Sequence, residues 1–150
     1  MNNASPPTQG AALRLALACD FEEVRRTADT VRTFLTGQGC SSADVMDCDL
    51  ALVEACNNAI EYAPAAARKQ AILLEAVCRP EEIELRITDH TAGFDLPRSP
   101  ALPNPDCETG RGLFLIQKLM HQVDYVRGHE GNTLTLRKRR AQNLRGKVLA

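Results

Sequence analysis

The amino-acid sequence predicts an α+β fold, a two-layer sandwich in which a mixed, mostly antiparallel sheet carries its helices on one face. Two pairs of strand-like segments, each joined by a short turn, indicate antiparallel hairpins. The helical segments stand apart from these hairpins along the chain, which favours a separate helical layer. With 150 residues, of which 44% are hydrophobic and 25% charged, the chain has the size and composition of one globular domain.

The first half of the chain predicts a strand followed by two helices. Leucines occupy every second position near the start, which is the period of a strand. Asp20 offers an N-cap for the first helix, while Ser41 and Ser42 offer one for the second, which Pro64 ends. These three elements are expected over residues 11–19, 21–35 and 43–62.

The second half predicts two hairpins separated by a loop and a helix. The loop, residues 90–109, holds Gly93 and four prolines, and a loop longer than about 15 residues in a compact domain is usually functional. Gly110, Arg111 and Gly112 then open the helix. Strands are expected over residues 71–78, 83–89, 123–127 and 133–138, and the helix over residues 113–122.

Composition and charge exclude several classes of function. One domain is expected over residues 11–139, between a disordered polar lead (1–10) and a flexible basic tail (140–150). A net charge of −1 gives no general attraction to nucleic acid, and without Trp an aromatic platform for single strands is not expected. No apolar run reaches the roughly 20 residues that span a bilayer, and no apolar signal segment is visible. We therefore expect a cytoplasmic protein without membrane or direct nucleic-acid partners.

The six cysteines predict neither a zinc site nor disulfides. No two have the C-x-x-C spacing of the usual zinc sites. Without a secretory signal, we expect a reducing compartment and free thiols. Cys48 and Cys56 share a helical stripe with Leu52, which favours positions in the core.

The second expected helix has a polar side whose residues can divide a chemical task. At roughly 100° per residue, Glu54, Asn58 and Glu61 fall together, away from the apolar side. A carboxylate can act as base toward an attacking hydroxyl, and an amide oxygen can ligate Mg²⁺. A solvated helix face is the alternative, although Asn57 and Asn58 are poor helix formers in mid-helix.

Two glycine-containing segments could border a nucleotide. Asp89 ends an expected strand, and Gly93 follows four residues later. A buried carboxylate there would accept a hydrogen bond from the amino group of adenine and repel the carbonyl oxygen of guanine. The glycines at 110 and 112 would let backbone N–H groups at a helix start face phosphates. A plain turn and simple punctuation between elements are the alternatives.

These motifs follow one another in a telling order. E-x-x-x-N on a helix precedes a strand that ends in Asp, with Gly four residues on; a Pro-rich loop, G-x-G-L and Gly-Asn-Thr follow. In this order they resemble the GHKL (Bergerat-fold) ATPase superfamily, and within it the compact anti-sigma factor serine/threonine kinase branch. The resemblance covers about residues 13–138, most clearly in the runs ALVEACNNAIEYA, ITDHTAGFD, GRGLFLIQKLMHQVDY and GNTLTLRK.

The resemblance implies a role for each matching residue. Glu54 matches the general base, Asn58 the ligand of Mg²⁺ and Asp89 the residue that reads adenine, while residues 90–109 match the mobile ATP lid. Arg111 would meet either the γ-phosphate or a partner. The implied nucleotide-binding residues are Asn58, Asp89, Thr91, Gly93, Gly110, Arg111, Gly112, Leu113 and Thr133.

Two residues depart from the family pattern. Thr91 stands where glycine is usual, and it would narrow the space beside the base or supply a hydroxyl. Tyr62 stands where the helix motif often ends in His. The phosphohistidine dimerisation domain of two-component kinases is missing, and the chain is too short for the gyrase, Hsp90 or MutL members, so we expect a stand-alone module.

The resemblance implies a serine/threonine protein kinase that binds ATP and Mg²⁺. Its substrate would be an anti-sigma factor antagonist of the STAS type, it would also bind a sigma factor, and it would form a homodimer. The alternative is a nucleotide-holding switch that sequesters a partner, or activates a phosphatase, without phosphorylating anything. A third alternative is an α+β domain without nucleotide. The presence of both Glu54 and Asn58 favours the enzyme.

Overall fold

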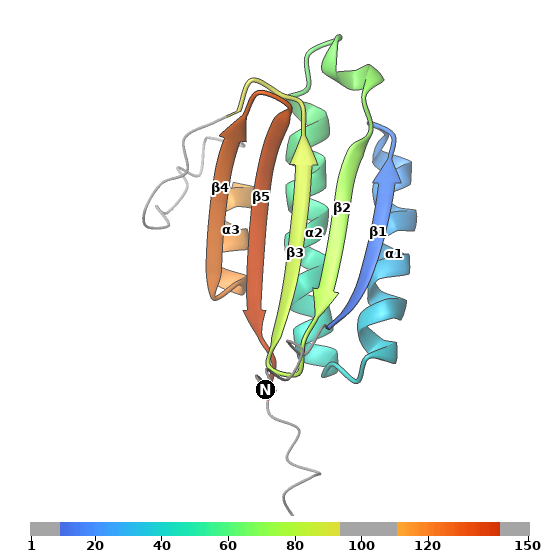
Figure 1. The fold of residues 1–150 in the computed structure, drawn as a ribbon, viewed down its shortest axis with the longest axis vertical. Helices are drawn as coiled ribbons and strands as arrows, with labels where there is room; N and C mark the ends of the chain where they lie inside the picture. Colours follow the sequence, from blue (N-terminus) through green and yellow to red (C-terminus); the bar gives the residue numbers. More distant parts are fainter. Residues whose placement is uncertain (1–9, 94–110, 142–150) are drawn as a thin grey trace, which may run out of the picture.

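The computed structural model of the protein describes residues 10–93 and 111–141, which form one five-stranded sheet with helices on one face (Figure 1). The strands are β1 (Ala11–Leu17), β2 (Ile72–Cys78), β3 (Glu82–Asp89), β4 (Gln122–Gly128) and β5 (Gly131–Arg139). The helices are α1 (Phe21–Gly37), α2 (Ser42–Glu61), the 3-10 helix η1 (Ala67–Lys69) and α3 (Arg111–Leu119). The α+β sandwich predicted from the sequence is confirmed.

The sheet has the order β1-β2-β3-β5-β4, and all four pairings among the described strands are antiparallel. Figure 1 shows α1 behind the β1 edge, α2 behind the centre and α3 behind β4 and β5. No helix in the described part of the chain is long and apolar enough to cross a membrane. Three parts of the chain lie outside the described residues: residues 1–9 of the expected lead, residues 94–110 with most of the expected lid and Gly110, and the tail from 142.

Local capping signals set the starts of the two long helices. The Asp20 Oδ1 accepts a hydrogen bond of 3.0 Å from the Glu22 N–H at the start of α1. The Ser41 Oγ accepts one of 3.1 Å from the Asp44 N–H at the start of α2. Each cap satisfies an otherwise unpaired backbone donor and typically contributes ~1 kcal/mol to stability. Both predicted helix starts are therefore correct to within a residue or so.

The core lies between the sheet and α2. Along β2, every second side chain from Ile72 to Cys78 is buried, while Leu73 on the opposite face is 50% exposed. Cys48, Leu52 and Cys56 of α2 are at most 1% exposed, as the stripe pattern predicts. Burial raises the pKa of the Cys48 and Cys56 thiols to about 12. All cysteines that the structure describes are free thiols.

The third helix is shorter than the sequence predicts. It ends at Leu119, so the expected extension to residue 122 is wrong, and Gln122 begins β4. The His121 N–H donates to the Arg137 carbonyl of β5 at 2.9 Å, which places this segment in the sheet. Sheet pairing at long sequence separation overrides the local helical pattern here.

Arg140 and Ala141, expected in a flexible tail, are tied into the fold. The Arg140 guanidinium donates to the carbonyls of Arg79 (2.9 Å) and Gln38 (3.1 Å). The Ala141 N–H donates to the Asp44 Oδ2 at 2.7 Å. Hydrogen bonds to the rest of the domain thus continue to Ala141, and one guanidinium caps carbonyls from two separate turns.

The sheet face away from the helices carries a network of ion pairs around Glu84. This side chain is only 3% exposed, and its carboxylate lies within 3.2–3.4 Å of the guanidinium groups of Arg79, Arg86 and Arg137. Burial alone would raise the pKa of Glu84, but the three arginines outweigh it and hold the pKa below its usual range. The network links β3, β5 and the turn between β2 and β3 on the open face.

Candidate functional site

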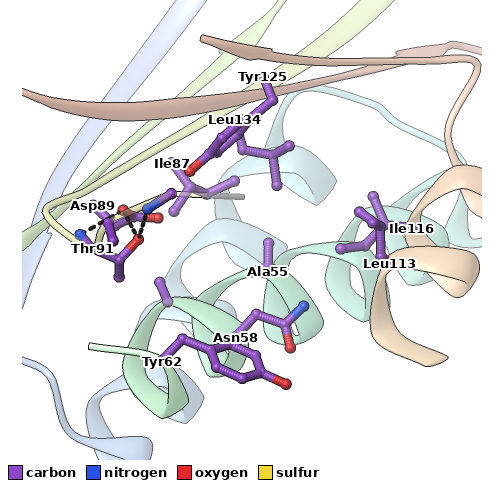
Figure 2. A pocket seen from close by; sticks show the side chains of 13 residues that line it. Ala55, Asn58, Tyr62, Ile87, Asp89, Thr91, Leu113, Ile116, Tyr125 and Leu134 are labelled. Atoms are coloured by element: carbon purple, nitrogen blue, oxygen red, sulfur yellow. Dashed lines mark hydrogen bonds between the residues drawn. The ribbon is translucent and has the colours of Figure 1, made fainter. Parts of the chain in front are cut away.

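A cavity of about 330 Å³ lies between α2, α3 and the helix-facing side of the sheet. Its volume is within the range of small-molecule pockets, about 300–1,000 Å³. Figure 2 shows Asp89 and Thr91 on one side of the view, and Leu113 and Ile116 of α3 on the other. The lining residues are Ala55, Asn58, Ala59, Tyr62, Ile87, Asp89, Thr91, Ala92, Gly93, Leu113, Ile116, Tyr125 and Leu134. An apolar chamber with a few polar groups is therefore available to a ligand.

Gly112 brings the start of α3 against two polar residues of α2. A Cβ atom at position 112 would stand 2.7 Å from the Glu54 Oε2 and 3.2 Å from the Asn58 Nδ2. Glu54 and Asn58 are both half-buried and lie one turn apart. Because α3 begins at Arg111, the N–H groups of its first turn, which have no acceptor within the helix, lie next to this pair. A carboxylate, an amide and a helix N-terminus, which attracts anions, thus meet in one place.

Asp89 ends β3 beside the cavity, and its carboxylate is held through one oxygen. Oδ1 accepts hydrogen bonds from the Thr91 N–H (3.0 Å), the Thr91 hydroxyl (2.9 Å) and the Asn132 Nδ2 (3.2 Å). No described residue donates to Oδ2. Asp89 is 8% exposed. The geometry leaves one carboxylate oxygen as an acceptor for a ligand.

The turn after Asp89 folds back onto β4. Gly93 has φ +85, and a Cβ there would lie 2.7 Å from the Arg127 Nε and 3.2 Å from the Tyr125 Oη. The Thr91 hydroxyl accepts from the Gly93 N–H at 3.1 Å, and the Arg127 Nη2 donates to the Ala92 carbonyl at 2.9 Å. Both the backbone conformation and the close contacts require glycine at this position.

The structure brings most of the expected site residues together. Those that line the cavity are Asn58, Asp89, Thr91, Gly93 and Leu113. Glu54 and Gly112 adjoin the cavity through Asn58. Gly110 and the side chain of Arg111 lie outside the part of the chain that the structure describes.

Thr133 lies away from the cavity. Its hydroxyl is 3.0 Å from that of Thr88, its partner in the β3–β5 register, and both residues border a hollow on the open face of the sheet. The residue that lies beside Asp89 is instead its register partner Asn132, which is 5% exposed. Sequence reasoning missed this role, although the alternation of β5 carried the signal. It also gave no ligand-facing role to Tyr125, which lines the cavity.

The residues present fit an adenine nucleotide with Mg²⁺. The Asp89 Oδ2 can accept from an amino group, and Ile87, Ile116 and Leu134 supply apolar walls for a base. The N-terminus of α3 suits phosphates, and the Asn58 amide oxygen suits a hard cation. No group of three or more His, Cys, Asp or Glu among the described residues could hold a metal ion.

Two solved structures have the same fold. The RsbU and RsbW domains of Rv1364c from Mycobacterium tuberculosis match with a TM-score of 0.67 and 20% identity over 88% of this chain. This chain spans only 33% of the length of that one. SiaB of the SiaB–SiaC complex from Pseudomonas aeruginosa matches this chain with a TM-score of 0.56 and 12% identity. The match covers 85% of this chain and 89% of the other.

At the level of sequence, no curated protein matches the chain. The family of histidine kinase-like ATPase domains, however, matches residues 17–138. That range runs from the last residue of β1 to the penultimate residue of β5 and includes every described residue around the cavity. ATP binding is implied by this family, in agreement with the expectation from the ordered motifs. The chain belongs to the histidine kinase-like ATPase domain family.

Proposed function

We propose that this protein is an ATP-dependent serine/threonine kinase of the anti-sigma factor type. It would act with Mg²⁺ in the cytoplasm as a homodimer, phosphorylate a STAS-type antagonist and bind a sigma factor. The observation that carries the proposal is the meeting of Glu54, Asn58 and Gly112 beside a cavity that Asn58 and Asp89 line. A general base, a metal ligand and a carboxylate that recognises adenine are the parts that such a transfer needs.

The chain's own residues would divide the work of the reaction. ATP supplies the phosphoryl group when bound, and Mg²⁺ supplies positive charge to its phosphates. Asp89 would orient the base, and the apolar walls would exclude water from it. The Asn58 amide oxygen would hold the cation, and the N–H groups at the start of α3 would face the phosphates. Glu54 would accept the proton of the serine or threonine hydroxyl.

A protein partner is supported by one comparison. SiaB was solved in a complex with SiaC, so a chain of this fold and of similar length binds a second protein. The sequence resemblance to the anti-sigma factor kinase branch gives the partners their proposed chemistry, a STAS domain and a sigma factor.

One observation favours the alternative of a non-catalytic nucleotide switch. Glu54 does not line the cavity, whereas Asn58 does. A protein in which Glu54 stays behind Gly112 would bind ATP and hold a partner without transferring phosphate. The two functions share the base pocket and differ only in the use of Glu54.

The deciding experiment is a transfer assay with γ-labelled ATP, Mg²⁺ and a purified STAS-domain protein encoded near this chain. We expect label on a serine or threonine of the STAS protein. Glu54→Ala should reduce the labelling by about 100-fold, because general base catalysis typically contributes 10²–10⁴. Glu61→Ala, an exposed position at the end of the same helix, is the matched control and should leave the rate unchanged.

Binding measurements separate the outcomes. ATP binding by the wild type without any transfer would overturn the kinase and leave the switch. Asp89→Ala should weaken ATP binding at least tenfold, since it removes a buried acceptor. Unchanged ATP affinity in this variant would overturn the assignment of the pocket itself.

A further inference from the structure

We propose that Asn132 is a positioning residue of the base pocket, whose side-chain amide fixes Asp89 so that only Oδ2 is offered to the base. This inference rests on the proposed binding of an adenine nucleotide and adds the residue that sets its selectivity. Asn132 itself does not line the cavity, so its action on a ligand passes through Asp89.

The amide nitrogen of Asn132 makes two hydrogen bonds on the side of the cavity. It donates to the Asp89 Oδ1 at 3.2 Å and to the backbone carbonyl of Thr91 at 2.8 Å. An amide nitrogen carries two hydrogens, so both bonds can form at once, whereas a serine or threonine hydroxyl could make only one. Asn132 is 5% exposed and lies directly opposite Asp89 in the β3–β5 register.

These two bonds make the other contacts of Asp89 depend on Asn132. The remaining donors to Oδ1 are the N–H and the hydroxyl of Thr91, which belongs to the turn after β3. Asn132 ties that turn to β5 through the Thr91 carbonyl. Without the tie, the turn and the carboxylate can rotate together, and the acceptor direction of Oδ2 is no longer fixed. Pre-organisation of this kind raises affinity and selectivity without a new ligand contact.

The close approach of β5 to β3 at the neighbouring Gly131 limits which side chains fit at position 132. A Cβ at Gly131 would lie 2.9 Å from the Asp89 carbonyl and 3.0 Å from the Thr88 Cγ2, so β5 is pressed against the end of β3. Since the strands approach this closely, the short side chain of Asn132 reaches both of its acceptors. A longer amide at this position would overfill the buried space.

The test compares two ligands in each variant. ATP carries the 6-amino group, and purine riboside triphosphate lacks it while keeping the sugar and phosphates. Affinities for both are measured by calorimetry for the wild type, Asn132→Ala, Asn132→Ser and Thr135→Val. Thr135 is the matched control, because it lies in the same strand with its partner Arg86 on the open face.

We expect the wild type to prefer ATP, and Asn132→Ala to lose about tenfold in affinity for ATP while its affinity for the analogue stays the same. Asn132→Ser retains one donor and should fall in between. Thr135→Val should keep the wild-type preference. Melting temperatures show whether each variant is folded. If the alanine variant is unfolded, the comparison of the two ligands is made with the serine variant.

Equal losses for both ligands in the Asn132 variants would mean a general structural role and overturn the proposal. Unchanged preference for ATP in these variants would overturn it as well. Both results leave the proposed function standing, because the wild type still binds ATP. A wild type that binds neither nucleotide would instead overturn the proposed function, and this inference with it.

Discussion

Replacement of Gly112 by alanine should separate the stability of the domain from its activity. A Cβ at this position would lie 2.7 Å from the Glu54 Oε2, whereas ordinary van der Waals contact begins at 3.4 Å. The carboxylate oxygen must therefore retreat by about 0.7 Å. Glu54 can make this movement at little cost to folding, because the crowded atom is the far end of a flexible side chain.

The two expected effects of Gly112→Ala have opposite signs. Alanine is favoured over glycine in a helix interior by roughly 0.5–1 kcal/mol. Position 112 lies in the first turn of α3, so the free energy of unfolding should stay level or rise by less than this. Phosphate transfer should fall by about 10-fold or more, because a displacement near 1 Å of a reacting group can cost about 100-fold in rate. The Asn58 amide, 3.2 Å from the new methyl group, would be disturbed as well.

The assay pairs a thermal melt with the labelled-phosphate transfer described above. Gly37→Ala is the control, because a Cβ at that helical position meets nothing within 4 Å. Gly37→Ala should therefore match the stability gain without loss of transfer. Full activity of Gly112→Ala would refute the view that the close approach of α3 to Glu54 serves the reaction. A large loss of stability would refute the view that Glu54 yields easily.

Two further predictions concern burial and charge. The pKa of Glu84 is below its usual range, so its stabilising contribution is complete above the ordinary carboxyl pKa of about 4.3 and is lost as pH falls through the lower folded value. Glu84→Gln should accordingly lower the free energy of unfolding by about 1–3 kcal/mol at pH 7, and urea titrations of both proteins should converge at acidic pH; a constant difference would count against the ion pairs. Cys48 and Cys56, with pKa values of about 12, should resist an aromatic disulfide reagent at pH 8 in the native protein and react in urea. Rapid native labelling of either thiol, located by mass spectrometry, would contradict their burial.

The elements that the sequence predicts well are those whose signals are local. Asp20 and Ser41 cap helices within three residues of themselves, so their side chains mark the starts of α1 and α2 directly. The end of α3 and the place of Arg140 are set by partners far away in the chain. The carbonyl of Arg137 draws His121 into the sheet, and the carbonyls of Gln38 and Arg79 hold Arg140. Such pairings cannot be predicted from the few residues of one helix turn, because the partners lie far apart in the sequence.

The candidate site also combines features that local sequence signals predict with features that only tertiary packing sets. The four-residue spacing of Glu54 and Asn58 fixes them to one side of α2 before any tertiary contact is known. The meeting of this pair with Gly112 needs the packing of α2 on α3, for which the sequence supplied only the order of the motifs. The Thr91 hydroxyl, which a glycine would lack, can donate to Asp89. Whether it does so depends on the geometry of the turn after β3, which the residue type alone does not determine.

Asn132 and Thr133 show where resemblance and strand geometry give different answers. The resemblance placed Thr133, and not Asn132, among the nucleotide-binding residues. In β5, Leu134 and Leu136 are buried apolar residues, so even-numbered positions face the helices and odd-numbered ones face the open side. By that alternation Asn132 belongs to the cavity side and Thr133 to the other, as the register with Asp89 and Thr88 bears out. A slip of one residue moves a side chain to the opposite face of a sheet, so the alternation of flanking apolar residues should decide such assignments before residue type does.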